Sequence, residues 1–254
     1  MMFFKNVPGS MDLKPYNIYH FLALSVTFIL AILIFVFRNK LKTNEKIDIR
    51  VRIIATIIAF SLEAGFHISN LVYHTDFVLR LIPLDLCAIS LWLAFILTLW
   101  KNEKIFKILY FWGIGGVISL FYPDIEGMGP DKLRFYHFFG VHSYIVLTVL
   151  YFLIVYGYRI NFGALVRAVC ILLPISFAVH LIDSLFYTSY KTDWMFLVAP
   201  PDISSILDLL PKGGWLYYFS ILLIGIFVLV MLYLPWGISK IVSNKKSVSE
   251  SVTV

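Results

Sequence analysis

Charged residues are scarce in this sequence of 254 residues, where Asp, Glu, Lys and Arg together make up 14%. Ordinary soluble domains carry about 25% charged residues, and no stretch of this chain is polar enough to form one. Hydrophobic residues reach 60%, which is typical of membrane proteins. The shortage of charge therefore excludes a soluble domain as the main body of the protein.

The sequence contains only two cysteines, and its first residues do not have the pattern of a signal peptide. The two cysteines, Cys87 and Cys170, lie in apolar runs that we expect at different depths, so a disulfide is not predicted. Residues 1–15 lack the apolar core and the cleavage site of a signal peptide. These absences leave membrane insertion of the whole chain as the main structural expectation.

Long apolar runs are what the sequence has instead. A helix needs about 20 apolar residues to cross the roughly 30 Å hydrocarbon core. The runs are long and do not alternate polar with apolar residues, which favours helices over barrel strands. We predict an all-α polytopic membrane protein, a bundle of about seven transmembrane helices. The expected spans are Asn17–Phe37, Arg52–Tyr73, Leu81–Trp100, Ile105–Tyr122, Phe135–Tyr156, Ala164–Tyr187 and Trp215–Trp236.

The distribution of Lys and Arg predicts the orientation of this bundle. The loops and tail on one side hold fourteen of these residues and those on the other side hold seven. Because the basic side is normally cytoplasmic, we expect the N-terminus outside and the C-terminus in the cytoplasm. The net charge of +6 is spread over loops, which indicates contact with anionic lipid and not with nucleic acid.

The predicted organisation has three parts. Residues 1–16 form an extracytoplasmic N-terminal segment, residues 17–236 the seven-helix domain, and residues 237–254 a cytoplasmic tail expected to be disordered. The outer loop 188–214 is rich in apolar residues, which favours a lid over the bundle mouth. Within it, Ser204 or Ser205 is a candidate N-cap for a short helix over 206–210.

Ionisable side chains inside the apolar runs are costly in a bilayer and need a packing or functional reason. All six histidines fall in the outer half of the predicted spans or in outer loops, whereas the inner half holds almost nothing ionisable. At about 1.5 Å per residue, Cys87, His142, His180 and His67 lie at a similar depth. We therefore expect a shared polar cavity open to the outer side. The groups that support it are Asp85, His180, Asp183, Glu63 and His67.

Each polar residue also has a purely structural interpretation. An intramembrane histidine is often an interhelical hydrogen-bond partner, and Glu63 or Asp183 can pair with one. His20, His74 and His137 lie close enough to the interface to be solvated.

Cys87 by itself is typical of a small buried hydrophobe. Its neighbours favour chemistry, because His142 at matching depth can deprotonate the thiol. Asp85 or Asp183 can in turn orient that imidazole.

Five stretches carry a family resemblance: IPLDLCAIS, YFWGIGGVISLFYPD, RFYHFFGVHSYIV, DWMFL and SSILDLL. In order and spacing they resemble the bacterial YwaF-type integral membrane proteins, over about Arg80 to Trp236. That family is similar to eukaryotic membrane acyltransferases that move a fatty acyl chain between phospholipids and make ether-lipid species through a cysteine acyl-enzyme. The resemblance implies a multi-pass protein of the bacterial plasma membrane, with Cys87 as nucleophile and His142 as base.

Three functions are consistent with these sequence features. The first is a membrane-embedded lipid acyltransferase or acyl-ester hydrolase at the outer leaflet, with membrane lipids as its partners and no cofactor. The second is a metal-dependent seven-helix hydrolase with His67, His142, His180 and Asp85 as zinc ligands, although the sequence has no HExxH motif. The third is a non-enzymatic ligand-binding or transport protein. The absence of an internal inverted repeat and of polar groups in the inner half favours chemistry or binding at one face over transport.

Overall fold

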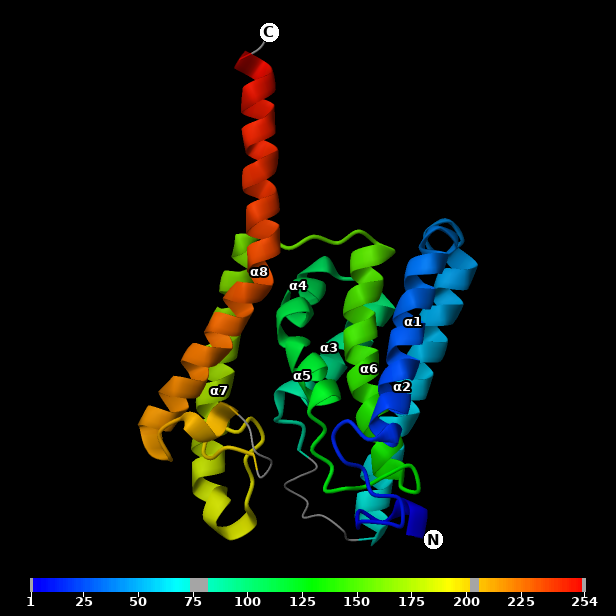
Figure 1. The fold of residues 1–254 in the computed structure, drawn as a ribbon, viewed down its shortest axis with the longest axis vertical. Coiled ribbons are helices and arrows are strands. Elements are labelled where there is room, and N and C mark those ends of the chain that lie inside the picture. The colour runs from blue at the N-terminus through cyan, green and yellow to red at the C-terminus, as the bar shows by residue number, and fades with distance from the viewer. Residues whose placement is uncertain (1, 74–81, 202–205, 253–254) are drawn as a thin grey trace. The chain divides into compact units, whose positions relative to one another are not determined.

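The apolar runs fold as helices over almost the whole chain (Figure 1). The structure is a computed structural model that describes residues 2–73, 82–201 and 206–252. No β-strand occurs in these ranges. The helices are α1 (Ile18–Thr43), α2 (Glu45–Tyr73), α3 (Leu86–Trp100), α4 (Glu103–Trp112), α5 (Ile114–Phe121), α6 (Leu133–Ile154), α7 (Phe162–Tyr190) and α8 (Gly214–Val252), with short 3-10 helices η1 (Met2–Phe4) and η3 (Ile206–Leu209).

Among the described residues, seven apolar helical segments correspond to the seven predicted spans. Six are long and apolar enough to cross a membrane, and α3 is a shorter apolar helix. Helices α4 and α5 meet at Gly113 and together form one of the six, over Glu103–Phe121. The all-α, seven-helix prediction is therefore confirmed, whereas the orientation of the termini stays a prediction.

The helix boundaries differ from the predicted spans. Helices α1 and α2 extend beyond the predicted spans and are separated by Asn44 alone. The predicted spans were shorter because hydropathy marks the thickness of the bilayer and not the length of a helix. Helix α3 begins only at Leu86, because Asp85 caps it by accepting a hydrogen bond from the Ala88 N–H at 2.7 Å. Helix α8 continues to Val252. The division of the chain into an N-terminal segment, a seven-helix domain and a C-terminal tail stays a prediction.

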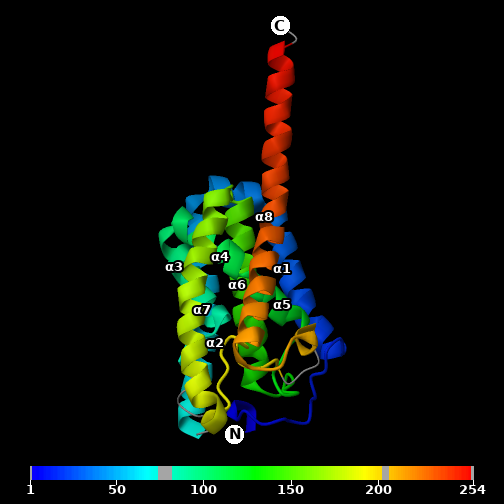
Figure 2. The ribbon, with the colours of Figure 1, turned by 90° about the vertical axis from the view of Figure 1, so that its left-hand side faces the viewer.

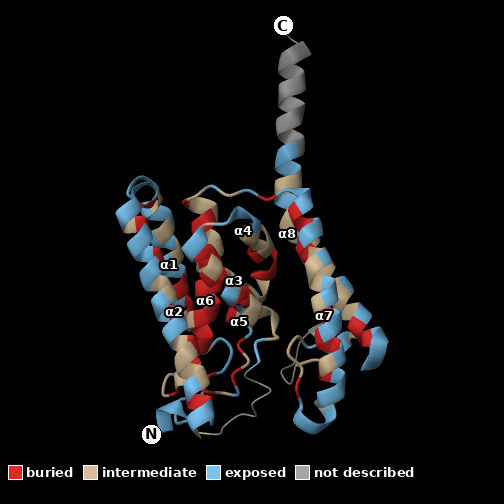
Figure 3. Cartoon of the chain, turned by 180° about the vertical axis from the view of Figure 1, so that it is seen from behind, coloured by how far each residue is buried: buried red, intermediate tan, exposed pale blue. Residues whose placement is uncertain are grey.

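The chain forms two compact units, residues 1–158 and residues 159–254. In the first unit, α6 packs against each of α1, α2, α3, α4 and α5 (Figures 1 and 2). Buried residues accordingly run along α6, while the outer faces of α1 and α2 are exposed (Figure 3). Those exposed faces are apolar, as lipid-facing surfaces are. In the second unit, α7 packs against α8.

The N-terminal segment covers one end of the first unit. The Leu13 N–H donates to the Gly127 carbonyl at 2.8 Å, and the Ser10 N–H donates to Asp131 Oδ2 at 2.9 Å. The side chain of Leu13 is 5% exposed and belongs to a buried apolar cluster that includes Phe135 on α6. The segment is therefore part of the packed structure and not a free arm.

A buried polar network lies at the end of the first unit opposite the N-terminal segment. Asp48 and Arg52 on α2 are paired at 3.0 Å, and both are buried. Asp48 also accepts hydrogen bonds of 2.6 Å from Tyr151 and Tyr156, and Lys101 lies 3.5 Å from the same carboxylate. These residues lie in segments that the sequence analysis assigned to loops, so the prediction that the inner half of the spans holds almost nothing ionisable stays a prediction, and the network adds buried charged groups next to it.

The network was missed because Arg52 and Lys101 were assigned to loops. The i, i+4 spacing of Asp48 and Arg52 is a signal for a pair on one helix face. Because the network's charged groups are hydrogen-bonded to one another, its arrangement is typical of a structural site.

Replacing Gly129 with alanine is expected to loosen the N-terminal segment, because a Cβ there would overlap the backbone carbonyl of Met11. Overpacking of this kind costs about 1–3 kcal/mol. Thermal unfolding in detergent, with limited proteolysis of residues 2–16, measures the effect. The matched control is Gly225→Ala in α8, where no atom lies within 4 Å of the new methyl; equal behaviour of the two variants would contradict the packing argument.

Candidate functional site

Four side chains of α2 and α6 form a hydrogen-bonded chain, which we call the α2–α6 polar cluster: Glu63, His67, Arg134 and His137. Glu63 and His67 lie one turn apart on the same face of α2, with Oε1 and Nε2 2.9 Å apart. The other carboxylate oxygen, Oε2, lies 2.7 Å from His137 Nε2. The predicted pairing of Glu63 with a histidine is confirmed, and it links two helices.

The partners of His137 determine which ring nitrogen carries its proton. The Arg134 guanidinium lies 2.9 Å from His137 Nδ1, and because a guanidinium only donates, Nδ1 is the acceptor. Nε2–H therefore donates to Glu63. The Phe66 ring stacks on the imidazole of His137 at 4.1 Å, and the Arg134 guanidinium lies over the Phe66 ring at 4.6 Å. The cluster is thus held in one arrangement by packing as well as by hydrogen bonds.

Cys87 lies in the first turn of α3, two residues after the capping residue Asp85. Its Sγ is 3.8 Å from Ser119 Oγ on α5. It also faces Gly115, because a Cβ built at that glycine would lie 3.2 Å from the sulfur. The thiol is therefore seated against a part of α5 that has no side chain to cover it.

His142 has one ring nitrogen committed and one available. Its Nδ1 lies 2.7 Å from the Phe138 carbonyl, and because a carbonyl only accepts, Nδ1 carries the proton in the neutral ring. Nε2 then keeps its lone pair. The sequence predicted that a carboxylate orients the His142 ring, but the Phe138 carbonyl is the group that bonds its Nδ1. The Asp85 carboxylate instead caps α3.

The glycine pair of α5 packs against the Cys87 side chain on one side and against the backbone of His142 on the other. Gly115 faces Cys87, and a Cβ at Gly116 would lie 3.4 Å from the backbone oxygen of His142. Both residues therefore lie beside the same turn of α5. Within the described part of the chain, no hydrogen bond joins Cys87 to His142.

His180 and Asp183 belong to the second unit, so their membership of a cavity with Cys87 stays a prediction. The His180 ring stacks on Tyr218 at 4.4 Å and meets Trp215 edge-on at 5.0 Å. Asp183 Oδ2 accepts from the Trp194 N–H at 3.2 Å. Both side chains are buried, and they join α7 to α8 and to the loop that follows α7.

The loop over residues 188–214 is organised around Asp193. Its carboxylate accepts hydrogen bonds from the backbone N–H groups of Leu197, Val198 and Ala199, and burial raises the pKa of this carboxyl. The helix expected over 206–210 is the short 3-10 helix η3, and Ser204 and Ser205 lie outside the described residues. The lid role of the loop stays a prediction.

Two histidines are buried where the sequence predicted solvation. His137 is 6% exposed because Glu63 and Phe66 of α2 pack on it. His20 is fully buried, with Nε2 2.7 Å from the Leu120 carbonyl and Nδ1 accepting from the Tyr16 N–H. Hydropathy could not predict these contacts, because they depend on which helices are neighbours. His74 lies outside the described residues.

Sequence reasoning missed Ser119 and the role of Arg134. Both fall inside stretches that the sequence analysis singled out, but neither belongs to a motif with a fixed spacing. Among the described residues, no group of three or more His, Cys, Asp or Glu side chains is arranged to hold a metal ion. We therefore assign no metal site to His67, His142, His180 and Asp85.

Replacing Glu63 with glutamine is expected to destabilise the first unit by about 1–3 kcal/mol, because a buried donor loses its acceptor. His67 and His137 bond different oxygens of Glu63, and in glutamine one of these oxygens is replaced by an NH₂ group that only donates. Thermal unfolding in detergent measures the loss. The exposed Glu126→Gln is the matched control and should change stability by less than about 0.5 kcal/mol; the same small change for Glu63→Gln would contradict a structural role for the cluster.

Comparison with known families gives one match. The chain matches the TMEM164 family over residues 15–233. No curated protein and no solved structure matches it. The resemblance to YwaF-type proteins is therefore wrong at the level of the family, because the family match assigns a different one. Short apolar and aromatic stretches discriminate poorly, since membrane helices draw on few residue types. The chain belongs to the TMEM164 family and is a multi-pass membrane protein.

Proposed function

We propose that this protein transfers or hydrolyses fatty acyl esters of membrane lipids, with Cys87 as nucleophile and His142 as general base. The observation that carries the proposal is the hydrogen bond between His142 Nδ1 and the Phe138 carbonyl. It leaves Nε2 as the basic nitrogen of a residue that lies beside the same α5 turn as the Cys87 thiol. A nucleophile and an oriented base at one level are the elements of covalent acyl transfer.

The Cys87 sulfur packs closely against α5 at Gly115, where an added Cβ would lie 3.2 Å from it. Ser119 Oγ, 3.8 Å from the sulfur, is a hydroxyl placed to donate to an oxyanion that develops beside it. The proposed substrates are lipids, which reach a membrane-embedded site directly from the bilayer.

The first half of the reaction acylates the thiol. His142 Nε2 takes the proton from Cys87, and the sulfur attacks the ester carbonyl to form a tetrahedral intermediate. The intermediate collapses with loss of the lipid alkoxide, which receives the proton from His142. The products are a thioester on Cys87 and a lipid with a free hydroxyl.

The second half removes the acyl group. His142 takes the proton from the hydroxyl of an acceptor lipid or from water, and the resulting oxygen nucleophile attacks the thioester. The thiolate leaves and recovers the proton. A lipid acceptor completes acyl transfer and water completes hydrolysis. Since a base acts within about 3 Å of the proton it moves, the mechanism requires Nε2 to lie within that distance of the Cys87 thiol in the substrate complex.

The first test is replacement of the thiol. In liposomes that contain a phospholipid with a labelled acyl chain and a lysophospholipid acceptor, Cys87→Ala is expected to lose labelled product by at least about 100-fold, because the covalent route is closed. Cys170→Ala is the matched control, since that exposed cysteine lies on α7. Wild-type product formation by Cys87→Ala would overturn the proposal.

A second test isolates the base. In His142→Asn the side-chain amide can still donate to the Phe138 carbonyl, but the basic nitrogen is gone. The rate is expected to fall by about 10²–10⁴-fold while thermal stability changes little. Intact-mass analysis after mixing with substrate should detect a hydroxylamine-sensitive acyl adduct on the wild type and far less on the variant. An unchanged rate of adduct formation would remove His142 from the mechanism.

A further inference from the structure

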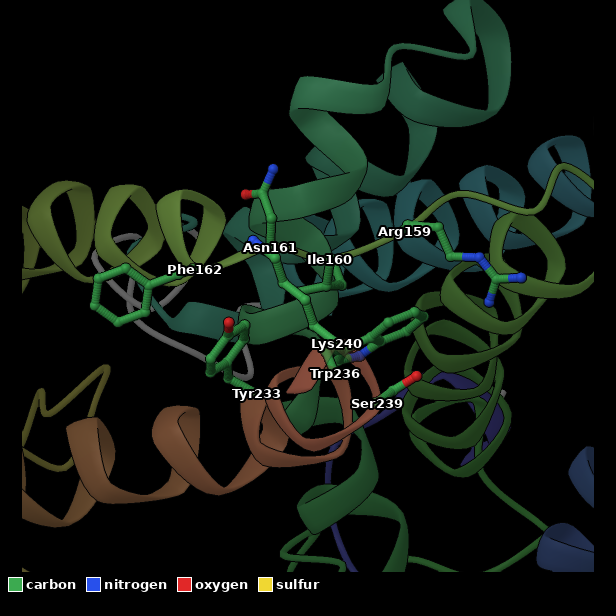
Figure 4. A pocket seen from close by; sticks show the side chains of 8 residues that line it. All are labelled: Arg159, Ile160, Asn161, Phe162, Tyr233, Trp236, Ser239 and Lys240. Atoms are coloured by element: carbon green, nitrogen blue, oxygen red, sulfur yellow. The ribbon is translucent and has the colours of Figure 1, made fainter. Parts of the chain in front are cut away.

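The second unit contains a hollow where α7 begins and α8 passes (Figure 4). Its volume is about 440 Å³, within the range of small-ligand sites. Four of its residues precede or start α7 and four come from α8. They are Arg159, Ile160, Asn161, Phe162, Tyr233, Trp236, Ser239 and Lys240.

The charge of this hollow is positive and uncompensated. Arg159 and Lys240 both line it, and none of the eight lining residues is acidic. Within the described ranges, neither cation forms an ion pair, and the guanidinium of Arg159 lies over the Trp236 ring with a distance of 5.6 Å to the centroid. Two cations that share one cavity repel each other, so an anion between them is favourable.

The walls of the hollow have the composition of a bilayer interface. Tyr233, Trp236 and Lys240 recur at a spacing of three and four residues, which places them on one face of α8. The Phe162 ring meets Tyr233 edge-on at 5.8 Å and closes the apolar side. Tyrosine, tryptophan and basic residues at the end of a span are typical of the headgroup level. The start of α7 adds the partial positive charge of a helix amino terminus.

We propose that this hollow binds a phosphate oxyanion, carried either by the headgroup of an anionic membrane lipid or by free phosphate. Arg159 and Lys240 neutralise the anion, and Ser239 donates a hydrogen bond to it. The Tyr233 and Trp236 rings pack against the glycerol region when the source is a lipid. The site lies wholly within residues 159–254 and uses neither Cys87 nor His142, so it does not depend on the proposed acyl chemistry.

The test measures bound lipid directly. The purified full-length protein is placed in nanodiscs of phosphatidylcholine with one fifth phosphatidylglycerol, and the lipid retained after mild release is counted by native mass spectrometry. Wild type is expected to retain phosphatidylglycerol in excess of its share. The double variant Arg159→Gln with Lys240→Gln is expected to reduce that excess about tenfold, since each basic residue at the surface strengthens binding of anionic lipid.

Two further variants control for charge and folding. Lys42→Gln with Lys46→Gln removes the same charge from two exposed residues of α1 and α2 and should retain the excess. Arg159→Lys with Lys240→Arg keeps both cations in the hollow and should also retain it. Size-exclusion profiles identify any variant that fails to fold.

The second arm distinguishes the two sources of phosphate. In neutral detergent, titration with inorganic phosphate is followed by the fluorescence of Trp236, with Trp236→Phe as the blank. Saturable binding that the double glutamine variant loses supports free phosphate, and selective retention of phosphatidylglycerol supports the lipid. The proposal is overturned if wild type and the double glutamine variant behave alike in both arms, or if the Lys42 and Lys46 variant loses as much binding as the Arg159 and Lys240 variant.

Discussion

Helix α6 supplies the hydrogen-bonding partner for buried polar side chains on three neighbouring helices. His137 bonds Glu63 of α2, Ser143 bonds Thr27 of α1, and Tyr144 bonds Thr98 of α3. Because the bilayer core contains no water, a polar group that leaves such a partner has nothing else to bond. The arrangement of the first unit depends on this one requirement.

The same requirement explains why the two polar regions of the first unit differ. The network around Asp48 and Arg52 consists of charged and phenolic groups bonded to one another, which is the pattern of a structural site. At the other end, Cys87 has only the Ser119 hydroxyl as a side-chain hydrogen-bond partner among the described residues, and His142 keeps one ring nitrogen unused. Chemistry needs groups with capacity to spare, so the second region is the better candidate for a reaction.

Sequence patterns predicted some parts of the site and missed others for a physical reason. The candidate pair of Cys87 and His142 could be placed at one depth because the helical rise converts residue counts into distance. The glycine pair of α5 and Ser119 could not be placed beside Cys87, because depth says nothing about which helices are neighbours. His20 and His137 were misjudged in the same way, since their burial comes from other helices.

The sequence by itself determined that the chain is helical, that it belongs in a membrane and that ionisable groups enter the apolar runs. These properties follow from hydropathy summed along the chain, and no contact between helices is needed to know them. Only the tertiary structure decided the partners of those groups: Glu63 with two histidines, His142 with a backbone carbonyl, and Arg159 and Lys240 around one hollow. Such partners are chosen by packing between helices distant in sequence, where geometry and not composition selects the contact.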